Sequence, residues 1–247
     1  MRSKRLISLL VAVCMMITML PLSAVTAFAA DTSTVHEAKD GEGIYRYAYK
    51  ENEDGETVTI TEFLGPVDPA NNGPYDIEIP TELDHHPVTG LGEYSFSGTY
   101  SPDHQTNHNL ISFCNQIQSV TIPESVTSIG KSAFEHCSKL DSLTIKGVAT
   151  SIGAYAFASC TSLTSLSLVG NFQTIGEQAF AYCGMTSLTT DADITSIGEY
   201  AFSHCTSLTS LSLTGSVQTI GYQAFACCTS LTSLSLTGSV QTIGYQA

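Results

Sequence analysis

The sequence predicts a mainly β fold, a solenoid built from coils of about 23 residues each. The first observation is an Ile-Gly pair that recurs at spacings of 22 or 23 residues between residues 129 and 244. The second is an alternation of apolar and hydroxyl residues, as in Leu211-Ser212-Leu213, which is typical of a half-buried strand. The third is the abundance of Ser and Thr after residue 125, which suits strands with a solvated outer face better than helices.

Residues 1–30 have the three parts of a secretory signal peptide. A basic start precedes an apolar run from Leu6 to Leu20, and the segment ends in small residues. The run has about 15 residues, whereas a membrane-spanning helix needs about 20, and Pro21 closes it. We therefore predict export with cleavage after Ala29 or Ala30, and no membrane span in the mature chain.

The charge of the chain limits its partners and divides it into two regions. The sequence contains 23 acidic and nine basic residues, for a formal net charge of −14. This charge argues against binding to phosphate backbones, so we expect no nucleic acid as a partner. Residues 31–125 hold 17 acidic and three basic residues, whereas residues 126–247 hold six and three. Two surfaces of different character are expected.

Residues 31–74 lack the repeat and are expected to form an N-terminal β cap. Tyr45, Tyr47 and Tyr49 alternate with other residues, and a second alternating run, 57–61, follows Asp54-Gly55. Two alternating runs around an Asp-Gly pair indicate a β-hairpin. A hairpin at this place would cover the strand edges and core that the first coil of a solenoid otherwise exposes.

Residues 75–125 contain two degenerate repeats. Val88, Leu91, Gly92 and Phe96 reproduce the spacing of the apolar positions in the later units, and a second partial match begins at Cys114. The stretch between Phe96 and Cys114 is longer than the repeat requires. We therefore expect a loop insertion at about residues 97–112.

Residues 126–247 form the regular part of the array. Each Ile-Gly pair is followed at a fixed distance by Phe and then Cys, and residues 205–224 recur unchanged as residues 228–247. One unit of this length buries too few side chains to offset its chain entropy, so the units must stack and share a core. The sequence stops at Ala247 where the pattern calls for Phe, and we expect a truncated array with an uncapped C-terminal end.

The pattern of one unit resembles the BspA-like leucine-rich repeat family of bacterial surface proteins. The residues that carry the resemblance are Leu208-x-x-Leu211-x-Leu213 and Val217-x-x-Ile220-Gly221-x-x-Ala224-Phe225-x-x-Cys228. It covers roughly residues 75–247 and implies a leucine-rich-repeat solenoid whose partners belong to a host surface or extracellular matrix. One unit departs from the pattern, because it is a residue shorter and has Met185 and Thr190 in place of leucines. A local irregularity near residues 191–193 is therefore expected.

Six cysteines occupy one position of the repeat and are interpreted as a structural core column. Small, weakly polar side chains suit this place beside the Phe, although a disulfide between neighbouring coils is also open because strands lie about 4.8 Å apart. Cys227 lies outside the column and is the candidate exposed thiol. The column comprises Cys114, Cys137, Cys160, Cys183, Cys205 and Cys228.

Other candidate chemistry is weaker, and we assign no catalytic residue, metal ligand or cofactor. In the pairs His136-Cys137 and His204-Cys205, the Cys could act as a nucleophile and the His as its base. Neighbouring residues of an extended chain point in different directions, however, so we do not assign this role. His104 and His108 lie in the expected insertion, which is a solvated loop or a contact loop. Asp191 and Asp193 lack the ligand ladder of a calcium-binding repeat, and no spacing of cysteines suits zinc.

Outward positions of the strands are the candidate ligand-binding residues. We expect them to stack into columns that form a broad and nearly uncharged face of hydroxyl groups. The candidates are Thr144, Lys146, Ser167, Ser212, Thr214, Ser235 and Thr237. Val169 shares their columns, and the second extended segment of each unit is expected to add the outward residues Thr127, Thr150, Gln173, Thr195, Gln218 and Gln241.

The function that we predict is that of a secreted or cell-surface repeat protein without enzymatic activity. It would mediate adhesion or bind protein or glycan ligands through the solenoid face, by many weak contacts summed along a rigid surface. The alternative is a targeting or binding module of a larger extracellular protein or enzyme. A further alternative is ice binding, which requires flat columns of Thr. The outward columns of this chain mix Ser, Lys, Val and Thr, which argues against that function.

Overall fold

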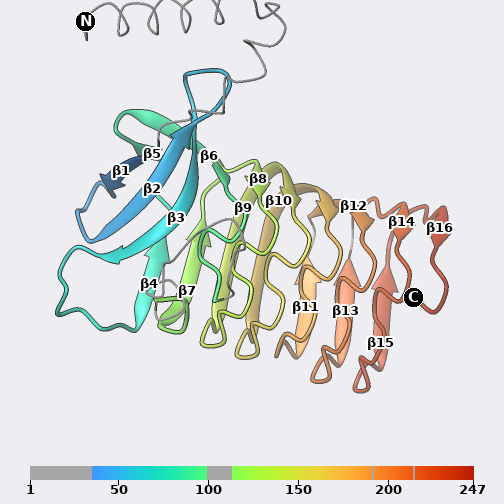
Figure 1. The fold of residues 1–247 in the computed structure, drawn as a ribbon. Coiled ribbons are helices and arrows are strands. Elements are labelled where there is room, and N and C mark those ends of the chain that lie inside the picture. The colour runs from blue at the N-terminus through green and yellow to red at the C-terminus, as the bar shows by residue number, and fades with distance from the viewer. Residues whose placement is uncertain (1–34, 99–112, 191, 214) are drawn as a thin grey trace, which may run out of the picture. The chain divides into compact units, whose positions relative to one another are not determined.

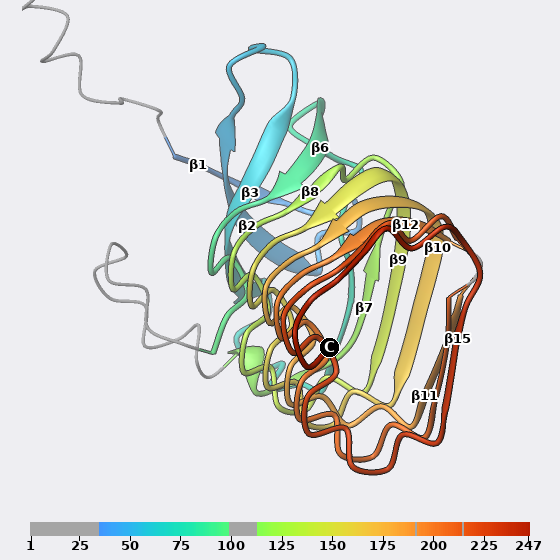
Figure 2. The same cartoon turned by 90° about the vertical axis from the view of Figure 1, so that its right-hand side faces the viewer.

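The computed structural model describes residues 35–98, 113–190, 192–213 and 215–247. Within these ranges the regular elements are strands, β1 to β16, and most of them follow one another as successive coils around a shared interior (Figures 1 and 2). The expected mainly β solenoid is confirmed. Residues 1–34, and with them the predicted signal peptide and its cleavage point, lie outside the described residues.

Each coil begins with a main strand, and the main strands pair in parallel with a register set by the repeat. Leu143 of one coil faces Leu166 of the next, for example, and Leu211 faces Leu234. This register stacks the leucines into inner columns and the hydroxyl residues between them into outer columns, although Leu234 of the last coil is exposed. The main strands are β4 (Tyr75–Glu78), β7 (Ile117–Ile122), the first parts of β9 (Ser142–Ile152) and β10 (Ser165–Ile175), β11 (Ser187–Thr190), β13 (Ser210–Leu213) and β15 (Ser233–Leu236).

A second strand follows each main strand after a bend. These second strands also pair in parallel, and in β9 and β10 the chain continues from main strand to second strand without interruption. The isoleucine of each Ile-Gly pair ends the second strand, and it is buried in the core in every pair except the last, where Ile243 is exposed. The second strands are β6 (His86–Leu91), β8 (Ser128–Ile129), the last parts of β9 and β10, β12 (Asp193–Ile197), β14 (Thr219–Ile220) and β16 (Thr242–Ile243).

The glycine of each Ile-Gly pair is required by the close approach of successive coils. A Cβ atom added to Gly176 would lie 2.6 Å from the carbonyl carbon of Gly153 and 2.7 Å from the nitrogen of Ala154. Both contacts are with backbone, which cannot move aside. The same crowding recurs at Gly130, Gly153, Gly198, Gly221 and Gly244. The pair is therefore a site of backbone packing.

An arc of turns closes each coil, and it carries two residues with left-handed backbone. In the coil from Gly153 these are Tyr155 and Ser159, with φ of 59° and 60°. The N–H groups of Tyr155, Phe157 and Ser159 each donate to a carbonyl oxygen of the next coil at 2.8 Å. Left-handed backbone is unfavourable for residues other than Gly, so these inter-coil hydrogen bonds offset a local cost. Apart from Asp84 and His85, every non-Gly residue of positive φ in the described ranges occupies one of these two arc positions.

A ladder of phenylalanine rings runs along the core of the solenoid. Neighbouring rings from Phe96 to Phe225 have centroids 4.6–5.7 Å apart and planes within 6–15° of parallel. The regular spacing of Phe in the sequence thus becomes a regular stack. The members are Phe96, Phe134, Phe157, Phe180, Phe202 and Phe225.

The N-terminal region combines antiparallel and parallel pairing. β1 (His36–Lys39) pairs with β2 (Tyr45–Glu51), and β2 pairs with β3 (Val58–Pro66), both antiparallel. β3 then runs parallel to β6, and β5 (Glu82–Leu83) forms a short antiparallel pair with β6. Phe63 of β3 stacks on Phe96 with ring centroids 5.3 Å apart. The hairpin is therefore joined to the first coil, and its role as a cap stays a prediction.

The series of main strands divides between β10 and β11. β11, β13 and β15 form a sheet of their own, whereas the earlier strands belong to the large sheet. The break falls in the short unit. Met185 and Thr190, which replace leucines there, are both buried, and the Thr190 hydroxyl donates to the carbonyl oxygen of Leu168 at 2.9 Å. A hydroxyl inside the core is thus satisfied by the preceding coil.

Two details of the expected architecture need correction. Thr150 was expected to face outward, but it is fully buried and its hydroxyl donates to the carbonyl oxygen of Val126 at 3.0 Å. A shift of register places Thr150 opposite the inward Phe172. Ser97 and Gly98, at the start of the expected insertion, still belong to the arc, because Gly98 donates to the carbonyl oxygen of Glu135 as a regular coil would. Residues 99–112 lie outside the described residues.

Candidate interaction face

Outward side chains of the main strands stack into two columns, which we call the hydroxyl face. In one column, Thr144 lies in register with Ser167, and Ser212 with Ser235. Thr121 and Thr189, which the sequence reasoning missed, belong to the same column. Their membership could have been found from the positions between the buried apolar residues of β7 and β11. A parallel column contains Ser119, Ser142, Ser165, Ser187, Ser210 and Ser233.

The structure divides the predicted ligand-binding residues into two groups. Thr144, Lys146 and Ser167 lie on β9 and β10, whereas Ser212, Ser235 and Thr237 lie on or next to the separate sheet of β13 and β15. Thr214 lies outside the described residues. Ser167, Ser235 and Thr237 are exposed, and Thr144 and Ser212 are half-buried between their neighbours.

The electrostatic character of the hydroxyl face changes along the solenoid. At its N-terminal edge, Asp76 and Glu78 of β4 lie in register with Ser119 and Thr121 of β7. Ser119 donates a hydrogen bond to the Asp76 carboxylate. Lys146 and the exposed Val169 lie side by side in the middle, and no charged side chain follows on β11, β13 or β15. The face therefore begins acidic and ends uncharged.

The second strands present a separate outer side. Thr127, Gln173, Thr195, Gln218 and Gln241 are exposed there. The chain bends between the main and second strands, so the second strands form a different side of each coil from the main strands (Figure 2). They therefore provide a comparison surface in the same coils.

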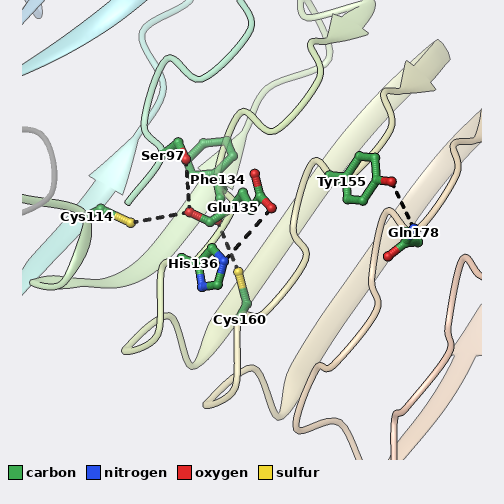
Figure 3. A network of polar contacts seen from close by, with 8 residues as sticks. All are labelled: Ser97, Cys114, Phe134, Glu135, His136, Tyr155, Cys160 and Gln178. Carbon is green, nitrogen blue, oxygen red and sulfur yellow. Dashed lines mark hydrogen bonds and ion pairs between the residues drawn. The ribbon is translucent and has the colours of Figure 1, made fainter. Parts of the chain in front are cut away.

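The cysteine column lies inside the arc. Cys114 and Cys137 form a disulfide, whereas Cys160, Cys183 and Cys205 are buried free thiols and Cys228 is a half-buried one. Each free thiol of the column donates to the carbonyl oxygen of the Phe one coil earlier, at 3.1–3.3 Å. Figure 3 shows this contact between Cys160 and Phe134, beside the hydrogen bond from Gln178 to Tyr155. The column therefore holds adjacent arcs together.

The environment of the buried thiols keeps them protonated. Burial raises the pKa of the Cys160 thiol, and it raises the pKa of the Cys183 thiol to about 12. The neighbouring Cys228 thiol and burial both raise the pKa of Cys205. A thiolate is the nucleophilic form of cysteine, so these three side chains are suited to packing. Cys227, next to the column, is exposed.

The His-Cys neighbours do not form nucleophile and base pairs. The Cys137 sulfur is bonded to Cys114, and the thiol of Cys205 donates to the carbonyl oxygen of Phe180. The ring of His204 instead stacks on Tyr182, with centroids 4.5 Å apart. His104, His108 and Asp191 lie outside the described residues. Within the described ranges, no group of three or more His, Cys, Asp or Glu side chains could hold a metal ion, and no helix is long and apolar enough to cross a membrane.

The repeat region matches a known family along most of the chain. A family model described as the BspA type leucine rich repeat region, with 6 copies, matches residues 77–183, 107–208 and 131–247. The chain belongs to the BspA-type leucine-rich repeat family. Among curated proteins, no sequence matches the chain.

Two solved structures share the fold of this BspA-type chain. A leucine-rich repeat protein of T. pallidum is 21% identical, with a TM-score of 0.55 over 79% of this chain and 91% of that protein. A leucine-rich repeat protein of Bacteroides ovatus is also 21% identical, with a TM-score of 0.51. That alignment covers 80% of this chain but 54% of the B. ovatus protein, so the chain spans about half of its length. Identities of this size show the common fold alone.

Proposed function

We propose that this BspA-type chain acts outside the cell, secreted or held at the cell surface, as an adhesion or protein-binding molecule without enzymatic activity. The observation that carries the proposal is the hydroxyl face, whose outward side chains repeat in register from β7 to β10 and again from β11 to β15. The signal-like residues 1–30 support export. Host-surface or extracellular-matrix proteins and glycans are the ligand classes that the family resemblance suggests.

The geometry favours binding by repetition. Each outward Ser or Thr offers a hydrogen-bond donor and an acceptor, and its backbone is fixed by strand pairing on one or both sides. Because the face is rigid before binding, an extended ligand loses little additional free energy to ordering of the protein. Many weak contacts can then add up along one direction.

The test is a pair of double variants in the same two coils. Ser212→Lys with Ser235→Lys places two ammonium groups on the hydroxyl face, and Gln218→Lys with Gln241→Lys places the same charges on the second-strand side. Binding of each purified protein to a panel of immobilised extracellular-matrix proteins is measured by surface plasmon resonance. We expect binding to be lost, by at least about tenfold, in the first variant and kept in the second.

Circular dichroism of both variants supplies the control for folding. Equal loss in the two variants would assign the effect to charge in general. Unchanged binding by the Ser212 and Ser235 variant would reject the hydroxyl face as the binding surface.

A further inference from the structure

A polar groove lies at the end of the sheet where β7 and β9 begin. It encloses about 500 Å³, within the range of about 300–1,000 Å³ that is typical of small-molecule sites. Three successive coils supply its polar side chains, and the loop before β4 supplies a proline ring. The residues that matter here are Pro74, Gln116, Gln118, Lys139, Asp141 and Ser162.

The groove side chains come from the turns and strand starts of neighbouring coils. Gln118, Lys139 and Asp141 are exposed and Gln116 is half-buried, whereas Ile117 and Leu140 between them are buried. Both pairs therefore line the groove from the outer side of the core. The Lys139 ammonium donates to Oε1 of Gln116 at 3.3 Å, which links the two coils across the groove.

The groove departs from the repeat that surrounds it. In a later coil the equivalent positions hold Ser207 and Thr209, and the Thr209 hydroxyl donates to the carbonyl oxygen of Thr186 at 2.9 Å. The corresponding Thr164 instead donates to Oδ1 of Asp141 at 2.6 Å. The last coils thus use small side chains to join neighbouring coils, whereas the first coils place longer amide and charged groups at the same positions.

Several hydrogen-bonding groups of the groove remain open to a ligand. Oδ2 of Asp141 has no hydrogen-bond partner within the described part of the chain, and Lys139 has two further N–H donors. The amide of Gln118 and the hydroxyl of Ser162 each both donate and accept. The opening therefore offers both donors and acceptors, and the opposite charges of Lys139 and Asp141 compensate each other.

A proline ring completes the opening. Pro74 is exposed, and the preceding Gly73 lies so close to Gln116 that an added Cβ would be 2.8 Å from the Gln116 Cβ atom. The loop is thus packed against the amide that lines the groove. A pyranose ring carries hydroxyl groups around its edge and C–H groups on its faces, and it requires donors, acceptors and an apolar platform together.

We propose that this groove binds one uncharged pyranose unit of a glycan, with Asp141, Lys139 and Gln118 holding its hydroxyl groups and Pro74 lying against its ring. An uncharged sugar is favoured over an acidic one because Asp141 balances the single ammonium and because residues 31–125 are strongly acidic. The site shares none of the residues of the hydroxyl face that carry the proposed function, so either can fail alone.

The test uses the mature chain and defined monosaccharides. Saturation-transfer NMR is recorded with N-acetylglucosamine, galactose and mannose as neutral probes, and with glucuronic acid and N-acetylneuraminic acid as acidic probes. We expect at least one neutral sugar to bind in the millimolar range. Asp141→Ala should weaken it by about tenfold or more, because a hydrogen bond to a charged group is lost.

Matched variants decide the outcome. Thr209→Ala removes a side chain at the equivalent repeat position outside the groove and should leave sugar binding unchanged. Gln118→Ala and Lys139→Ala, which leave the Thr164 contact intact, test the site again if Asp141→Ala lowers the thermal stability. Binding of acidic sugars alone, no binding of any neutral sugar, or equal effects of Asp141→Ala and Thr209→Ala would each overturn the proposal.

Discussion

The N-terminal region and the regular coils pack their buried aromatic rings in different ways. In the N-terminal region the rings of Tyr45, Phe63, Tyr75 and Phe113 meet at steep angles, with interplanar values of 59–80°. In the regular coils the phenylalanine rings are stacked within 15° of parallel. Edge-to-face contacts are a favoured geometry for isolated aromatic pairs. Translation of one unit by one coil permits only parallel rings.

The repetition of one unit also repeats its unfavourable backbone features and the hydrogen bonds that offset them. Each coil of the regular region repeats the same left-handed arc residues and the same crowded glycine, and each offsets them with hydrogen bonds to the next coil. Strands β1, β2 and β3 of the N-terminal region depend instead on side-chain packing and antiparallel pairing. Stability in the regular coils is therefore a property of neighbouring pairs.

The largest effect is expected from removal of one ring of the ladder. Phe157 lies between Phe134 and Phe180, with centroids 5.2 and 5.3 Å away, and it is fully buried. Phe157→Ala should lower the free energy of unfolding by about 3–5 kcal/mol, measured by urea denaturation. Phe113→Ala in the N-terminal cluster should cost less than half as much, because Phe113 is half-buried. Equal losses would remove the distinction between ladder and cluster.

A smaller effect is expected where successive coils touch through glycine. Gly176→Ala would place a Cβ 2.6 Å from the backbone of Gly153, so we expect a loss of about 2 kcal/mol in the free energy of unfolding. Gly41 in the N-terminal region has open space around it, and Gly41→Ala should change stability by less than about 0.5 kcal/mol. Thermal unfolding of the two variants checks the contrast. A tolerated alanine at position 176 would show that the coils can separate without cost.

The smallest effect concerns pH and the thiol column. The pKa of Cys183 is raised from 9.0 to about 12 in the folded protein, so the unfolded chain loses this proton first as the pH rises. Stability from this group is complete below pH 9 and declines between about pH 9 and 12. By pH 10 the wild type should have lost about 1 kcal/mol relative to Cys183→Ser, which cannot ionise in this range. Denaturation at pH 8 and pH 10 measures the difference, and parallel curves would contradict it.

Much of the fold could be predicted because the sequence repeats. The spacing of Ile129 and its equivalents determines the coil length, and the alternation in Leu211-Ser212-Leu213 determines which side chains face inward. The left-handed arc residues could not be predicted, because Tyr155, Ser159 and Tyr182 have side chains without a preference for that backbone. Contacts with the next coil impose it. Thr150 was misplaced for a similar reason, because its orientation follows from a register shift against Phe172.

The two candidate sites differ in how much of them could be predicted from the sequence. The periodicity predicts the column of Thr144, Ser167, Ser212 and Ser235. It does not predict that the sheet divides between β10 and β11, because this depends on where the backbone accommodates the missing residue of the short unit. The polar groove was missed. Its signal was the replacement of Ser and Thr by Gln118 and Asp141 at fixed repeat positions, and only the loop before β4 shows that these positions border a cavity.

The hydrogen bonds between successive arcs allow a solenoid of this kind to be lengthened by whole units. The N–H groups of each arc donate to the coil that follows, and the acceptors are the same atoms in each repeat. An additional copy of the unit therefore finds its complete set of partners in the coil before it and offers the same set to the coil after it. The identical segments at residues 205–224 and 228–247 fit this description. Duplication of a unit can therefore lengthen the solenoid without requiring a new type of contact between coils.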